Sequence, residues 1–207
     1  MRIKDDVEHT LTINKSEFIC YLHKCFSEED ARDYINKIRK LHREATHCCT
    51  AFVIGENNEI QRSNDDGEPS GTAGMPILDA LRKSGITNCC ACVVRYYGGI
   101  KLGAGGLIRA YSGSVSEALQ AAKKVDVRMM SIYQCSFSYD LINQFDFFLK
   151  DLGTILDKTY EIDVCYTILT DNPTFFDECI EYTNGKVSPH FIEEKLVEVD
   201  LPTINSN

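Results

Sequence analysis

Apolar residues change their spacing along the chain, and this change predicts both strands and helices. In the first 125 residues, short apolar runs predict strands at 11–13, 17–22, 47–54, 60–62 and 89–97. Apolar residues three and four positions apart predict helices at 31–41, at 76–83 and from Leu107 to Ala122. Charged residues occupy the opposite side of the first helix, which we therefore expect to cover a sheet.

The composition changes around Val125–Met130, and we place a domain boundary there, with domains at 1–128 and 129–207. In the second part, strands are predicted at 131–139, 154–161, 164–169 and 187–199, with helices at 141–152 and from Asp171 through Tyr182. The order β-α-β-β-α-β is the plan of the ferredoxin-like fold. The sequence thus predicts an α+β protein with a C-terminal ferredoxin-like domain.

Charge divides the chain in a similar way. Residues 1–130 hold 18 Lys and Arg against 17 Asp and Glu, whereas residues 131–207 hold 4 against 14, for a net charge of −9. Residues 82–124 carry seven basic residues and one acid, Glu117. A basic patch beside an acidic domain fits selective anion binding, and it does not fit a generic nucleic-acid coat, which would be basic throughout.

The expected location is the cytoplasm. The chain has no apolar run of membrane-spanning length, and its N-terminus, M-R-I-K-D-D-V-E, lacks the apolar core of a signal peptide. Disulfides are rare in that compartment, so the ten cysteines are interpreted as small apolar core residues. One C-x-x-C, Cys89 to Cys92, falls in a predicted strand, where its two ends point to opposite faces. A metal or redox role is the alternative, but a second correctly spaced pair is missing.

A glycine-rich loop between the strand at 89–97 and the long helix is the first candidate site. The glycine loop, residues 98–106, contains Gly98, Gly99, Gly103, Gly105 and Gly106. We expect the helix to begin near Gly106, where unpaired amides and the positive end of the helix dipole attract anions. Three cations lie in or beside the loop, Arg95, Lys101 and Arg109. The alternative is a turn that needs glycine only for tight packing, because neither a dinucleotide fingerprint nor a P-loop is present.

A second long loop carries acids. The acidic loop, residues 63–74, reads S-N-D-D-G-E-P-S-G-T-A-G. Long irregular loops in compact domains are often functional. Asp65, Asp66 and Glu68 could hold a cation or act as general acid or base, although a calcium-loop match fails. The alternative is a solvated turn in which Asp65, Ser70 and Thr72 cap backbone groups.

Three stretches together resemble the YigZ/IMPACT family: D-D-G-E-P-S-G-T-A-G at 65–74, V-V-R-Y-Y-G-G-I-K-L-G-A-G-G-L-I-R-A-Y at 93–111, and His47 upstream. The resemblance implies an N-terminal α/β domain of the ribosomal-protein-S-five domain-two-like type. It also implies a C-terminal domain similar to the fifth domain of elongation factor G. Eukaryotic relatives in this family look like translational regulators, so a link to translation is expected.

Two hypotheses about function remain open. The first is a translation-associated regulatory protein that binds RNA or the ribosome, with a phosphate site at the glycine loop. The second is an enzyme acting on a small phosphorylated or carboxylated ligand, with the acidic loop holding a metal or moving a proton and His47 as its acid–base partner. No residue is assigned a catalytic or metal-binding role, and no cofactor and no membrane partner are expected; the expected state is a monomer. The expected ligand contacts are Arg95, Gly99, Lys101, Gly103, Gly105, Gly106, Arg109, Asp65, Asp66, Glu68, Ser70, Thr72 and His47.

Overall fold

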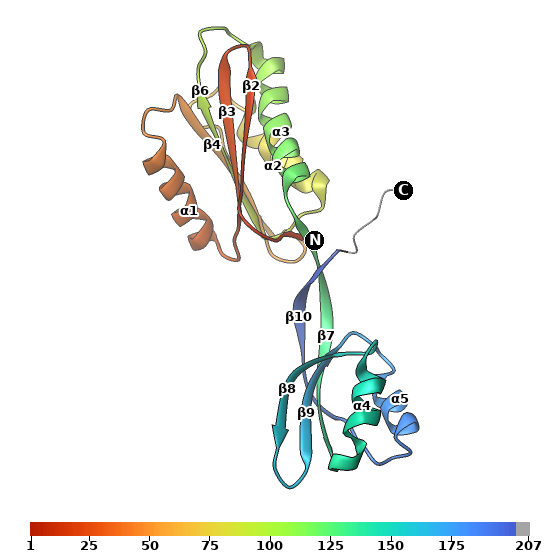
Figure 1. Cartoon of the computed structure of the whole chain (residues 1–207). Coiled ribbons are helices and arrows are strands. Elements are labelled where there is room, and N and C mark those ends of the chain that lie inside the picture. Colours follow the sequence, from red (N-terminus) through yellow and green to blue (C-terminus); the bar gives the residue numbers. More distant parts are fainter. Residues whose placement is uncertain (202–207) are drawn as a thin grey trace. The chain divides into compact units, whose positions relative to one another are not determined.

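The computed structural model describes residues 1–201. These residues form two compact units, Met1–Asp126 together with Asp200 and Leu201, and Val127–Val199 (Figure 1). Each unit has its own hydrophobic core. Within the described range, no helix combines the length and the apolar character that crossing a membrane requires.

A five-stranded antiparallel sheet forms the centre of the N-terminal unit. Its order is β2-β3-β6-β4-β5, with bounds Val7–Ile13, Ser16–Lys24, Cys89–Tyr96, His47–Ile54 and Ile60–Asn64. Asn14 and Lys15 adopt positive φ in the tight turn that joins β2 to β3, and this confirms the predicted hairpin. Both strands are longer than predicted. In β2, exposed polar residues alternate with inward-facing ones, so no apolar run marks the start of the strand.

Helices cover both faces of this sheet (Figure 1). Helix α1, Glu28–Leu41, packs on one face, and Ser27 caps it by accepting a hydrogen bond from the Asp30 amide at 3.1 Å. Helices α2, Gly74–Ser84, and α3, Gly103–Ala121, pack on the other face. The sheet is therefore buried on both sides, which explains the continuous apolar runs of β4 and β6.

The cysteines behave as core residues, as predicted. Cys89 belongs to the core under α2 and α3, whereas Cys92 belongs to the core under α1. The two thiols of the C-x-x-C therefore lie on opposite faces of β6. All ten cysteines are free thiols, and nine of them are buried.

The C-terminal unit has the predicted ferredoxin-like topology. Its sheet runs β10-β7-β9-β8, with β7 at Lys124–Phe137, β8 at Thr154–Tyr160, β9 at Val164–Thr170 and β10 at His190–Asp200. A short 3-10 turn, η1 at Tyr139–Leu141, leads into α4, Ile142–Leu149, and α5 follows at Phe175–Tyr182. The start of β7 also pairs with β1, Arg2–Ile3. The α+β fold class is confirmed for both units.

The predicted start of the long helix was wrong. Helix α3 begins at Gly103, so Gly105 and Gly106 lie in its first turn and not in a loop. The cluster of glycines suggested a loop because glycine is a poor helix former in isolation. Packing of the helix onto the sheet overrides that local preference.

Gly98 shows why part of the glycine loop needs glycine. A Cβ built on Gly98 would lie 2.0 Å from the backbone carbonyl carbon of Lys15, in the β2–β3 turn. The Gly98 amide also donates a hydrogen bond to Ser16 Oγ at 3.1 Å. The close backbone approach at this position is therefore to the chain itself and not to a ligand.

We predict that Gly98→Ala lowers the free energy of unfolding by about 1–3 kcal/mol, because the added methyl overlaps the Lys15 backbone. The matched control is Gly113→Ala in α3, where an added Cβ has no neighbour within 4 Å. That change should stabilise the protein by about 0.5–1 kcal/mol through helix propensity. Denaturant unfolding followed by circular dichroism measures both. An unchanged midpoint for Gly98→Ala would refute the packing argument.

Candidate functional site

The acidic loop and the start of α3 face one another across a pocket of the N-terminal unit. The cavity measures about 410 Å³ and is lined by Thr46, His47, Glu68, Pro69, Arg95, Tyr97, Lys101, Leu102, Gly103, Ala104 and Leu107. Its volume lies within the range of small-molecule sites, and most of its lining is apolar with a few polar groups. The two stretches singled out in the sequence therefore build one site.

The start of α3 gives one side of this pocket a positive character. Gly103 and Ala104 line the pocket, and Leu102 at the N-cap position offers no side-chain oxygen to accept from the first amides. Uncapped amides and the helix dipole favour an anion at such an end. Lys101, exposed and also lining the pocket, adds a full positive charge. This side of the pocket can hold a phosphate or a carboxylate.

A buried ion pair forms the base of the pocket. Glu68 Oε1 accepts hydrogen bonds from the Arg95 guanidinium at 2.6 Å and from the Tyr111 hydroxyl at 2.7 Å. The side chains of Glu68 and Arg95 are 4% and 6% exposed, so water screens this pair weakly. Burial beside Glu68 and Cys49 raises the pKa of Tyr111, which keeps its hydroxyl protonated and donating. Arg95 thus neutralises Glu68 and is not an open cation.

His47 has a fixed orientation at the same wall. Its Nδ1 lies 2.8 Å from the backbone oxygen of Asp66, which can only accept, so Nδ1 carries the proton. Nε2 is then directed to Glu68 Oε2, at 3.9 Å. In the neutral form this Nε2 is an acceptor on the lining of the pocket.

Tyr97 is a pocket residue that the sequence reasoning did not select. The residue is 45% exposed, and the Arg95 guanidinium lies over its ring at 5.4 Å from the centroid. A detectable signal existed, because Tyr97 follows Arg95 by two positions and residues two apart share a strand face. The sequence reasoning also missed the apolar lining residues Leu102, Ala104 and Leu107. It considered the glycines of this stretch and not its apolar side chains.

Asp65 has a structural role. Its carboxylate accepts hydrogen bonds from the amides of Gly71 at 2.8 Å, Ala73 at 3.1 Å and Gly74 at 2.7 Å. The last two amides open α2, whose own N-cap residue provides no side-chain acceptor. Asp65 therefore caps α2 from a distance in sequence, as one of the two interpretations of the acidic loop expected.

Asp66 also has its donors within the chain. One carboxylate oxygen accepts from the Arg39 guanidinium at 3.1 Å and the other from the Cys48 amide at 2.7 Å. The three carboxylates of the acidic loop thus meet different partners. In the part of the chain that the structure describes, no group of three or more His, Cys, Asp or Glu side chains could hold a metal ion. The acidic loop therefore does not bring its carboxylates together as a ready-made metal site.

The predicted ligand contacts divide into two sets. Five of them line the pocket: His47, Glu68, Arg95, Lys101 and Gly103. The others do not line it, namely Asp65, Asp66, Ser70, Thr72, Gly99, Gly105, Gly106 and Arg109. Thr72 donates to the Pro69 carbonyl at 2.6 Å, and Arg109 extends toward Gly105 on its own helix. Spacing in the sequence does not reveal which side of a helix turn or loop faces a cavity.

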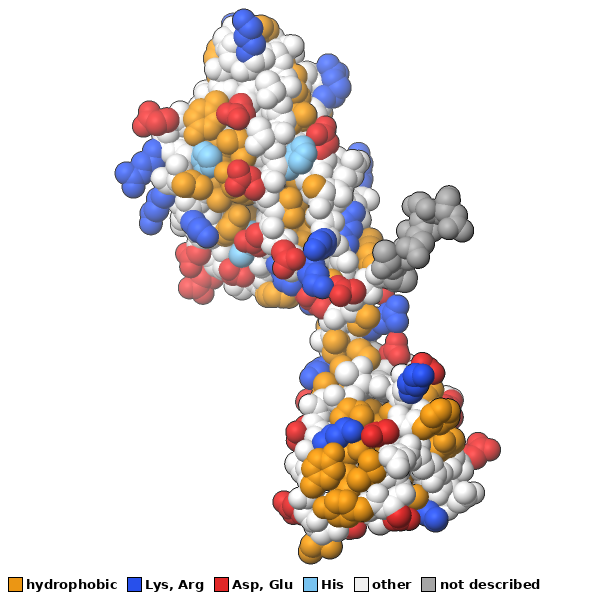
Figure 2. Space-filling model, viewed as in Figure 1, with side chains coloured by type: hydrophobic (Ala, Val, Ile, Leu, Met, Phe, Trp, Pro, Cys, Tyr) orange, Lys and Arg blue, Asp and Glu red, His pale blue; other side chains and the backbone are white. Residues whose placement is uncertain are grey.

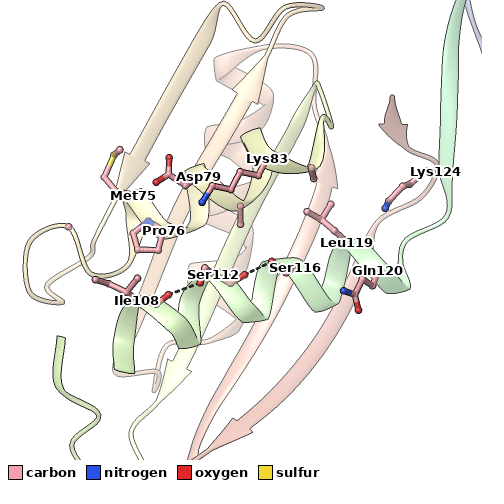
Figure 3. A pocket seen from close by; sticks show the side chains of 13 residues that line it. Met75, Pro76, Asp79, Lys83, Ile108, Ser112, Ser116, Leu119, Gln120 and Lys124 are labelled. Carbon is pink, nitrogen blue, oxygen red and sulfur yellow. Dashed lines mark hydrogen bonds between the residues drawn. The ribbon is translucent and has the colours of Figure 1, made fainter. Parts of the chain in front are cut away.

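A larger hollow of about 620 Å³ lies between α2 and α3 (Figure 3). Its hydroxyls are already used, because Ser112 donates to the Ile108 carbonyl at 2.8 Å and Ser116 to the Ser112 carbonyl at 2.9 Å. Its charges are of both signs, with Asp79 on the lining together with Lys83 and Lys124. We therefore place the candidate site at the smaller pocket, where the polar groups converge. Figure 2 shows basic and acidic side chains interspersed on the visible face of the N-terminal unit, without a broad basic area.

Fold and site together define a class: an α+β protein of two units whose first unit carries a small pocket with a cationic side. Residues 14–119 match the Impact N-terminal domain family. IMPACT family member YvyE of Bacillus subtilis (strain 168) is 44% identical over 191 residues, 89% of this chain and 87% of the relative. IMPACT family member YigZ of Escherichia coli (strain K12) is 38% identical over 152 residues, 72% of this chain and 74% of the relative. The chain therefore belongs to the IMPACT family, as the sequence motifs suggested.

One solved structure resembles the whole chain. It is described as a crystal structure of a hypothetical protein, and it matches with a TM-score of 0.58 and 32% sequence identity. The match covers 94% of this chain and 97% of that one. The likeness supports the fold of both units.

The cap that Asp65 provides predicts a pH effect. Burial opposes ionisation of this carboxyl, but the three backbone donors outweigh it and hold the pKa of Asp65 below its ordinary value. A carboxyl with a lowered pKa in the folded state adds stability above its unfolded pKa of about 3.9, and that stability is lost as the pH falls through the folded pKa. Asp65→Asn should therefore show a smaller fall in unfolding free energy on acidification than the unmodified chain. Asp33→Asn, on the exposed side of α1, should show the same fall as the unmodified chain. Chemical denaturation between pH 2 and 7 tests this, and identical pH profiles for Asp65→Asn and the unmodified chain would contradict it.

The buried pair of Glu68 and Arg95 should contribute far more to stability than an exposed ion pair does. Glu68→Ala leaves the Arg95 guanidinium without its partner in a buried position and should destabilise the N-terminal unit by about 3–5 kcal/mol. Arg32→Ala removes the exposed pair with Glu28 on α1 and should change stability by less than about 0.5 kcal/mol. Urea unfolding measures both variants. Equal, small effects would show that the pair does not support the pocket.

Proposed function

We propose that this protein is a translation-associated binding protein whose N-terminal unit holds one phosphate group of an RNA partner in the pocket at the start of α3. The observation that carries the proposal is the uncapped start of α3 opening, together with Lys101, onto a walled pocket. Such an arrangement positions a single anion. The link to translation rests on the family, whose eukaryotic members resemble translational regulators.

The charge distribution supports selective over general binding. The first 130 residues are close to neutral, and the chain after residue 130 has 14 acids against 4 basic residues. An acidic unit repels nucleic acid that does not make specific contacts. Arg95 limits the repulsion that Glu68 would exert on a bound phosphate, because the two side chains pair within hydrogen-bond distance.

A second candidate function is an enzyme acting on a small phosphorylated or carboxylated ligand. The small size of the pocket favours it, together with the orientation of His47, whose Nε2 faces a carboxylate on the lining. Here His47 would take or give a proton while Lys101 and the α3 amides hold the anion. The metal-assisted form of this idea lacks a ligand set among residues 1–201.

The decisive variant is Lys101→Glu. If the pocket holds an RNA phosphate, reversal of this charge should weaken binding of a structured RNA about tenfold and lower the salt slope by about 1. Fluorescence anisotropy at 50 and 200 mM salt measures both quantities. Lys40→Glu is the matched control, because Lys40 is exposed on α1, on the other face of the sheet. RNA affinity that is independent of salt, or equal losses in the two variants, would reject an RNA site at this pocket.

The two functions are separated by what co-purifies with the chain. RNA recovered with the unmodified protein and lost with Lys101→Glu supports the binding protein. A small phosphorylated or carboxylated compound recovered instead, and retained by His47→Ala without conversion, supports the enzyme.

A further inference from the structure

We propose that the pocket takes a nucleoside 5′-phosphate, with the base against the ring of Tyr97 and the phosphate at Lys101 and the start of α3. The inference rests on the proposed function, since it assumes that the pocket holds a phosphate. It adds a second recognition element that is aromatic and uncharged. The nucleotide could be one residue of an RNA strand or a free nucleotide, because the two share this chemistry.

Tyr97 is held as a stacking surface. The Arg95 guanidinium contacts two rings, at 5.4 Å from the centroid of Phe18 and 5.4 Å from that of Tyr97. The Tyr97 amide donates to Thr46 Oγ1 at 3.1 Å, which fixes the backbone at the end of β6. Nearly half of Tyr97 is nevertheless exposed. A ring that is fixed by a cation yet exposed in a pocket loses little freedom when a base stacks on it.

The remaining walls suit a nucleoside. Pro69, Leu102, Ala104 and Leu107 give the pocket an apolar surface next to Tyr97. An inorganic anion makes no use of such walls, whereas the base and the sugar of a nucleotide can bury apolar surface there. A volume of about 410 Å³ is within the range of small-ligand sites.

Polar atoms remain for the base edge or the sugar hydroxyls. Arg95 is 5% exposed, and its Nε has no hydrogen-bond partner among the residues that the structure describes. Buried donors are nearly always paired, and this Nε is an exception on a residue that lines the pocket. His47 and Glu68 line the same pocket and add further polar groups.

Calorimetric titration of the full chain tests the inference with three small probes, inorganic phosphate, ribose 5-phosphate and each ribonucleoside 5′-monophosphate, and with a single-stranded oligoribonucleotide. We expect the monophosphates to bind about tenfold or more tightly than ribose 5-phosphate, as stacking of one base provides. Tyr97→Ala should remove this advantage and leave the affinity for ribose 5-phosphate unchanged. Tyr97→Phe should keep it, and so should Tyr139→Ala, which removes an exposed tyrosine of the C-terminal unit.

The outcomes separate the inference from the function on which it rests. Equal affinities for ribose 5-phosphate and the monophosphates would overturn the stacking contact while the phosphate site stands. No binding of any of the three probes, and none of a single-stranded oligoribonucleotide, would overturn both. An oligoribonucleotide that binds more tightly than the monophosphates and depends on Tyr97 identifies an RNA strand as the source. Tighter binding of one free monophosphate identifies a small nucleotide.

Discussion

The candidate site depends on the buried ion pair between Glu68 and Arg95. It joins three elements that are distant in sequence, because Glu68 belongs to the acidic loop, Arg95 to β6 and the third partner, Tyr111, to α3. A charge buried without a partner is strongly destabilising, so the loop is held where the two donors lie. That position places Pro69 opposite the start of α3 and closes one wall of the pocket.

Asp65 and Asp66, the other acids of the loop, also hold it in place. Asp65 accepts hydrogen bonds from the amides at the start of α2. Asp66 accepts hydrogen bonds from Arg39 of α1 and from Cys48 of β4. Carboxylates are strong acceptors for backbone amides, so a loop without regular structure can still be well fixed. A stretch rich in acids is thus mainly a support for its neighbours, and the positive groups of the pocket, Lys101 and the first amides of α3, lie on the opposite wall.

The two units differ in charge and in the sites that they carry. The first contains the pocket, whereas the second is acidic and closes its own core with aromatic residues such as Phe137, Phe145 and Tyr166. Several large apolar side chains remain exposed on this unit, among them Phe147 and Ile162. Figure 2 shows apolar side chains gathered on its visible face. In the proposed function, its negative charge disfavours nonspecific contacts with RNA, and the pocket of the first unit recognises the anion.

The sequence by itself determined the elements, the α+β class, the ferredoxin-like order and the family, because apolar periodicity and long motifs are local signals. It also singled out the acidic loop, the glycine-rich stretch and His47 as candidate site residues, and part of each lines one pocket. Only the tertiary structure decided that Arg95 turns inward to Glu68, that α3 starts at Gly103 and that Tyr97 faces the pocket. These outcomes depend on which side chains meet across the fold, and pairing of buried charges and packing of a helix on a sheet override the preferences of any single segment.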